Sequence, residues 1–124
     1  MTKILIVDDE KMLRRLLSED LAKHGYDVIE AENGETAFEL FESETPALII
    51  SDLMMPLMDG YGLYKKVVEK TPGFPYILIT GYPEELNRFD IKTKGNFVVI
   101  QKPFEESEII SVITKILQHS PKTP

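Results

Sequence analysis

Side chains that could do chemistry stand directly after short apolar runs of this sequence. The runs are followed in turn by Asp8, Asp9 and Glu10, by Asp52, by Thr80, and by Gln101, Lys102 and Pro103. A cluster of like carboxylates is costly unless a cation neutralises it, and hard oxygen ligands suit Mg²⁺ or Mn²⁺. If the fold brings these aspartates together, we expect a divalent-metal site.

The same residue types also fit phosphoryl transfer to an oxygen. That reaction requires an attacking oxygen and preorganised charges around the phosphoryl group. In this interpretation Asp52 attacks, while the Thr80 hydroxyl and the Lys102 ammonium hold the phosphoryl oxygens. A carboxylate nucleophile needs no separate base, because aspartate is ordinarily ionised at neutral pH.

Each of these residues also has a simpler interpretation. Asp9 stands just before an expected helix, where a carboxylate acts as a cap. Asp52 opens a segment rich in turn-forming residues, which makes a capped turn the alternative there. Thr80 and Lys102, taken singly, are an ordinary strand-end hydroxyl and a solvated lysine. Capping accounts for only one of the acids, and a turn does not explain a carboxylate directly after a buried strand.

The apolar runs indicate the strands that position these residues. Residues 4–7, 47–50, 76–79 and 97–100 are almost continuously apolar, as in parallel strands buried on both faces. Residues 27–31 are more mixed and fit an edge strand.

Segments with helical spacing of apolar residues lie between the strands. They carry Leu13, Leu16, Leu17 and Leu21; Ala37, Leu40 and Phe41; Leu63, Val67 and Val68, starting near Gly60; and Ile109, Val112, Ile113, Ile116 and Leu117. Segment 82–96 has few apolar residues, so we expect a short or irregular fourth helix there. The alternation predicts a three-layer α/β/α domain with a parallel sheet, whose strands end at one ligand-binding edge.

Composition limits the remaining possibilities. The chain has 124 residues, 43% of them hydrophobic, which fits one domain over residues 1–118 with a disordered tail over 119–124. A net charge of −7 argues against direct nucleic-acid binding, and the lack of cysteine excludes thiolate metal sites. No apolar stretch approaches the roughly 20 residues that span a bilayer, so we expect a cytoplasmic protein without a membrane partner.

The motifs together resemble the receiver domain of two-component response regulators, a CheY-like superfamily, from Lys3 to about Leu117. ILIVDDE, SDLMMPLMDG, Thr80-Gly81 and KPF at 102–104 occur in the order and spacing of that family. The resemblance implies a flavodoxin-like, five-stranded sheet in the order 2-1-3-4-5, which the alternation alone leaves open. It also implies a signalling domain and not an enzyme, one that assists its own phosphorylation and dephosphorylation.

The resemblance implies a role for each acidic residue. Asp52 accepts a phosphoryl group from a histidine kinase or a histidine phosphotransfer protein, and this changes the affinity for a downstream partner. Asp9 and Asp52 ligate Mg²⁺, or Mn²⁺, together with the backbone carbonyl of Met54. Asp8 acts on the metal largely through water.

The resemblance also implies how a phosphorylated Asp52 is sensed. Lys102 pairs with the phosphoryl oxygens, Thr80 moves to hydrogen-bond one of them, and Lys102-Pro103 is a cis peptide. The family often has an aromatic residue three positions before the lysine, but here that position holds Val99. Aromatic coupling cannot operate at that position, which leaves the switching mechanism open.

Two other functions fit parts of the pattern. A degenerate receiver would act as a phosphorylation-independent interaction module, which Val99 and the weak fourth helix favour. The retained Asp9, Asp52, Thr80 and Lys102 oppose it. A metal-dependent phosphatase of the haloacid-dehalogenase type needs a second aspartate two residues after the nucleophile, where this chain has Met54. The downstream protein or effector domain is not identified by the sequence. We expect a monomer or weak dimer, either a stand-alone regulator or one domain of a longer protein.

Overall fold

The computed structural model describes residues 2–82, 84–85 and 96–119. Strands and helices alternate along the chain: β1 (Lys3–Val7), α1 (Lys11–Lys23), β2 (Asp27–Ala31), α2 (Gly34–Glu44), β3 (Leu48–Asp52), α3 (Gly60–Lys70), β4 (Tyr76–Thr80), β5 (Phe97–Gln101) and α5 (Glu106–His119). The expected fourth helix falls outside the described residues, apart from two helical positions at 84–85. The expected tail also falls outside them, apart from His119 at the end of α5.

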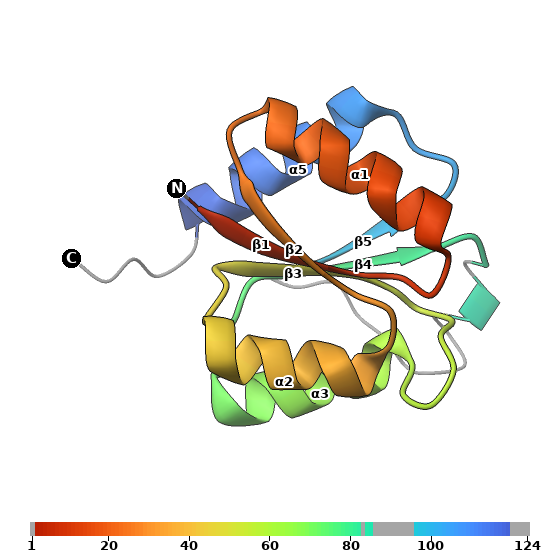
Figure 1. Cartoon of the computed structure of the whole chain (residues 1–124), viewed down its shortest axis with the longest axis vertical. Coiled ribbons are helices and arrows are strands. Elements are labelled where there is room, and N and C mark those ends of the chain that lie inside the picture. The colour runs from red at the N-terminus through yellow and green to blue at the C-terminus, as the bar shows by residue number, and fades with distance from the viewer. Residues whose placement is uncertain (1, 83, 86–95, 120–124) are drawn as a thin grey trace.

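The five strands form one parallel sheet in the order β2-β1-β3-β4-β5. This confirms the predicted fold class, including β2 at an edge. In the register, Val7 pairs with Ser51 and Thr80 pairs with Gln101, so the carboxyl ends of the strands lie level. The helices α1 and α5 cover one face of the sheet and α2 and α3 the other (Figure 1). The residues that follow the strands are therefore delivered to one edge, between the two helical layers.

The core consists of two apolar clusters, one on each face of the sheet. Alternate residues of each strand enter opposite clusters, so that Leu5 and Ile49 face α2 and α3 while Ile4 and Ile50 face α1 and α5. Strands buried on both faces need apolar residues at every position. This explains the nearly continuous apolar runs, and it makes the sheet a rigid base for the residues at its edge.

Helix α1 buries less of its apolar surface than its sequence spacing suggests. Leu17 and Leu21 are buried against the sheet, but Leu13 and Leu16 are 42% and 56% exposed. The four leucines therefore do not form one buried face. Leu13 instead lines a cleft at the carboxyl edge of the sheet.

In the part of the chain that the structure describes, no helix is long and apolar enough to cross a membrane. The described helices are instead amphipathic coverings of the sheet, with buried positions facing the two core clusters.

Candidate functional site

Three aspartates meet at the carboxyl edge of the sheet. One carboxylate oxygen from each of Asp8, Asp9 and Asp52 lies within 4.8 Å of the others. Asp8 and Asp9 directly follow β1, and Asp52 is the last residue of β3, whereas the sequence placed it just after the strand. The neighbouring pairing of β1 with β3 brings the two strand ends together. The convergence predicted from the sequence is thus present for all three acids.

Lys102 reaches the same cluster from the end of β5. Its Nζ donates a hydrogen bond to Asp52 Oδ2 at 2.9 Å, and the Asp52 side chain is only 11% exposed. Burial acts to lower the pKa of Lys102, but the hydrogen bond and charge of Asp52 outweigh it, so the net shift is upward. A protonated ammonium is therefore held against the carboxylate.

The surroundings of Asp8 disfavour the ionised form of its carboxyl group. Burial raises its pKa, and the charges of Asp52 and Asp9 add to the rise. The backbone N–H of Glu10, which donates to Asp8 Oδ1 at 2.9 Å, and the charge of Lys102 oppose it. Burial is the largest cause of this shift, and the neighbouring carboxylates add a like-charge repulsion that a bound cation would relieve. The site is electrostatically suited to a cation.

A cleft of about 460 Å³ opens above the cluster. Its lining consists of Asp9, Glu10, Leu13, Asp52, Met54, Gly81, Tyr82 and Lys102. Carboxylates with open, solvent-facing positions are the ligand set that Mg²⁺ prefers, since it keeps several waters. The donor set and the space fit a hydrated Mg²⁺ or Mn²⁺, and Met54 lines the same cleft as two of the acids.

Thr80 lies at the end of β4, and its side chain is almost fully buried, with 1% exposure. Its Oγ1 accepts a hydrogen bond from the Tyr82 backbone N–H at 3.0 Å. The Lys102 N–H donates to the Thr80 carbonyl at 2.8 Å, which ties the ends of β4 and β5 together. The predicted cis peptide at Lys102-Pro103 is confirmed.

Sequence reasoning missed Arg14, which supports the acidic edge from α1. Its Nη1 donates to the Asp8 carbonyl oxygen at 2.6 Å, and its Nε pairs with Glu30 at 2.9 Å. An arginine one turn into a helix that follows two aspartates is a weak signal on its own. Only the packing of α1 beside β2 shows that it anchors the backbone at Asp8. Val99 is half-buried and packs on the face covered by α2 and α3.

Comparison with known proteins gives a consistent match. The model of the response regulator receiver domain family matches residues 4–114. The chain is 38% identical over 120 residues to a probable transcriptional regulator, ycf27, of Porphyra purpurea, covering 97% of this chain and 49% of that protein. It is 40% identical over 118 residues to histidine kinase P4 of Formosa agariphila, covering 94% of this chain and 8% of the kinase. The chain therefore spans about half the length of the curated regulators it matches first.

Solved structures agree with the sequence comparison. The response regulator protein TrrA from Thermotoga maritima, in complex with Mg²⁺-BeF, superposes with a TM-score of 0.80 at 32% identity. That match covers 94% of this chain and 99% of the other.

Proposed function

The chain belongs to the response regulator receiver domains of two-component systems, and on that premise we propose that Asp52 accepts a phosphoryl group from a histidine kinase or a histidine phosphotransfer protein. The observation that carries the proposal is the contact between Lys102 Nζ and Asp52 Oδ2 inside a cluster of three carboxylates. A carboxylate held against the Lys102 ammonium, beside acids that a divalent cation would neutralise, is arranged to receive a phosphoryl group. Receiver domains are signalling domains, and this assignment gives the chain a signalling role.

The transfer uses few groups of the protein. A carboxylate oxygen of Asp52 bonds to phosphorus as the bond from phosphorus to the donor's imidazole nitrogen breaks, and the imidazole leaves with that electron pair. Lys102 neutralises charge on the phosphoryl oxygens, and the Thr80 hydroxyl donates a hydrogen bond to one of them. A Mg²⁺ held by Asp9, Asp52 and the Met54 carbonyl, with Asp8 acting through water, would neutralise further charge. Attack of water on the acyl phosphate would reverse the modification.

The environment of Thr80 suggests how phosphorylation of Asp52 would change the conformation that a partner binds. Its oxygen accepts from the Tyr82 N–H, so a new bond to a phosphoryl oxygen would pull on the loop after β4. Val99 offers no aromatic ring for this movement, and the threonine itself is the candidate switch. The partner that reads this change is either a separate protein or an effector domain. A cytoplasmic location and a monomer or weak dimer stay predictions, for fractionation and light scattering to test.

Labelling with a small phosphoryl donor tests the proposal. Acetyl phosphate with Mg²⁺ should add one phosphoryl group to the wild type, and Asp52→Asn should abolish labelling, as read by intact-protein mass spectrometry. Asp27→Asn is the matched control, because Asp27 is an exposed acid at the start of β2, the opposite end of the sheet. Equal labelling of wild type and Asp52→Asn would contradict the proposal.

A further inference from the structure

Two fully buried hydroxyl groups form a short hydrogen-bonded chain beneath the acidic site. Ser51 Oγ lies 2.7 Å from the Tyr76 hydroxyl oxygen, and that hydroxyl donates to the Gly60 carbonyl oxygen at 2.9 Å. A carbonyl oxygen can only accept, so the single Tyr76 proton is committed to Gly60 and Ser51 donates to Tyr76. The chain therefore runs in one direction, from β3 through β4 to the first residue of α3.

This chain closes the loop that follows Asp52. The Gly60 N–H donates to the Leu53 carbonyl at 2.8 Å, and the Leu53 N–H donates to the Ile79 carbonyl at 2.8 Å. A Cβ at Gly60 would lie 2.2 Å from the Asp52 carbonyl oxygen, so α3 begins in direct contact with β3. The ends of loop 53–60 are thus fastened to each other and to β4. Met54, the second residue of this loop, lines the acidic cleft.

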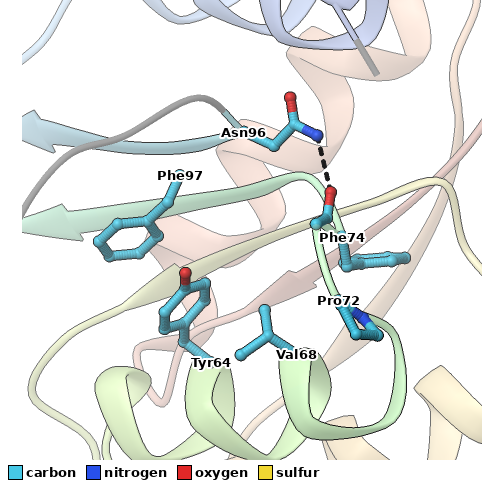
Figure 2. A pocket seen from close by; sticks show the side chains of 7 residues that line it. Tyr64, Val68, Pro72, Phe74, Asn96 and Phe97 are labelled. Atoms are coloured by element: carbon cyan, nitrogen blue, oxygen red, sulfur yellow. Dashed lines mark hydrogen bonds between the residues drawn. The ribbon is translucent and has the colours of Figure 1, made fainter. Parts of the chain in front are cut away.

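The Tyr76 hydroxyl is unexpected at its position. The rest of β4 is aliphatic except for Thr80, and an aliphatic side chain would fill a core position without burying a polar atom. The Tyr76 ring packs edge-on against Tyr64 at 5.1 Å between centroids and lies 6.1 Å from Phe97. Figure 2 shows Tyr64 of α3 facing Phe97 of β5, and both rings also lie against the Tyr76 ring.

The hydroxyl is also a constant donor. Burial raises the pKa of Tyr76 above its ordinary value, so the hydroxyl is protonated at neutral pH and can donate. The ring is held by aromatic packing and the proton is directed at one carbonyl oxygen. Such an arrangement can hold loop 53–60 in place without taking part in the chemistry at Asp52.

We propose that Ser51 and Tyr76 are positioning residues that hold loop 53–60, and with it the Met54 backbone, in the geometry that binds a divalent cation beside Asp52. Neither residue is among those that line the cleft, so both would act through the closed loop. The inference rests on the proposed function, because Met54 is the ligand implied by the family resemblance. Groups that orient a metal ligand from behind typically change metal affinity by about 10–100-fold when removed.

A titration with Mg²⁺ alone tests the inference. Tyr76→Phe keeps the ring and removes the hydroxyl, and it should weaken the Mg²⁺ Kd about tenfold, measured from the amide NMR shifts of loop 53–60. Labelling by acetyl phosphate should fall at low Mg²⁺ and recover as Mg²⁺ approaches saturation. Tyr64→Phe is the matched control, because it removes a hydroxyl from the neighbouring ring that makes no hydrogen bond to any described residue. Its Kd should equal that of the wild type.

A second variant keeps the test decisive if Tyr76→Phe fails to fold. Ser51→Ala removes the donor at the other end of the chain and should also weaken the Kd, by a smaller factor. A wild-type Kd in every folded variant of the pair would overturn the inference, even with a lowered Tm, because the hydroxyls would then be purely structural. A wild type that binds Mg²⁺ but takes no phosphoryl group would instead reject the proposed function, and the Kd comparison would still decide on Ser51 and Tyr76.

Discussion

Asp8 is about as buried as Asp52, but the Lys102 hydrogen bond goes to Asp52 and not to Asp8. The Asp8 carboxylate accepts the Glu10 N–H, yet its burial and the nearby charge of Asp52 still raise its pKa. An ionised Asp8 is therefore a source of instability in the folded protein when no cation is bound. A bound cation would remove this cost, because it would neutralise the negative charge around Asp8.

This yields a pH-dependent prediction for Asp8→Asn without divalent cations. Because the folded pKa lies above the unfolded value of about 3.9, the folded chain binds more protons between those two values. Stability is therefore highest below the unfolded pKa and is lost as pH rises through the folded pKa. Asn keeps the oxygen that accepts the Glu10 N–H but carries no charge. Asp8→Asn should unfold at a higher temperature than the wild type at neutral pH.

Thermal unfolding in EDTA over a pH series checks this. The advantage of Asp8→Asn should shrink as pH falls toward the unfolded pKa, while Asp27→Asn, which changes an exposed acid far from the cluster, should show no such trend. A variant less stable than the wild type at neutral pH would show that Asp8 contributes stability as a carboxylate.

Site residues divide into those that sequence reasoning could place and those that it could not. Asp52, Thr80 and Lys102 were predictable because each stands at the end of an apolar run, and parallel strands end at one edge. The roles of Arg14 and Tyr76 depend on partners distant in sequence: Arg14 contacts the Asp8 carbonyl and Glu30, and Tyr76 contacts a serine and a glycine. Neither strand nor helix periodicity carries information about such pairings.

Among the elements, the junction of loop 53–60 with α3 leaves no room for a side chain at Gly60. Asp59 caps α3 by accepting the Gly62 N–H at 2.7 Å, and Gly60 then passes directly over β3. A Cβ on Gly60 would meet the Asp52 carbonyl oxygen at 2.2 Å and Leu78 Cδ1 at 2.7 Å. The nearest of these atoms is backbone, which cannot turn aside as a flexible side chain can.

Gly60→Ala should therefore destabilise the fold by about 2–3 kcal/mol, the cost typical of forcing atoms into a packed interior. Gly62→Ala is the matched control two residues along the same helix. Its Cβ would meet Asp59 Oδ1 and Met58 Cγ at 3.4 Å, an ordinary contact, and alanine favours helix by up to about 1 kcal/mol. Urea unfolding of both variants checks the prediction, and equal stability of the two would contradict it.

Helices show where sequence periodicity is sufficient and where it is not. Helix α3 begins at Gly60, as expected. The buried positions of α5 also agree with expectation, because one face of that helix packs on the core and sets their spacing. In α1, Leu13 and Leu16 have the same apolar character as Leu17 but stay largely exposed. Periodicity identifies an apolar face, and only the position of the helix over the sheet decides how much of that face is covered.

At the scale of the whole molecule, two electrostatic effects must be separated. The chain carries a net charge of −7, so any salt that screens self-repulsion could stabilise it slightly. The three converging carboxylates form a local site, which a divalent cation would bind only in the folded state. Their strands are held level by the sheet, and in the unfolded chain Asp8 and Asp52 are far apart in sequence. Specific binding and general screening thus predict different responses to Mg²⁺.

Mg²⁺ should raise the Tm of the wild type far more than NaCl of equal ionic strength. A ligand that binds only the folded state adds RT ln(1 + [L]/Kd), about 2.7 kcal/mol when its concentration is a hundredfold above Kd. Asp9→Ala removes an exposed ligand from the cluster without creating a core cavity, and it should lose most of this increment. Thermal unfolding of both proteins in Mg²⁺ and in matched NaCl measures the difference. If NaCl stabilised the wild type as much as Mg²⁺ does, the effect would be screening of the net charge, and the acidic edge would not be a metal site.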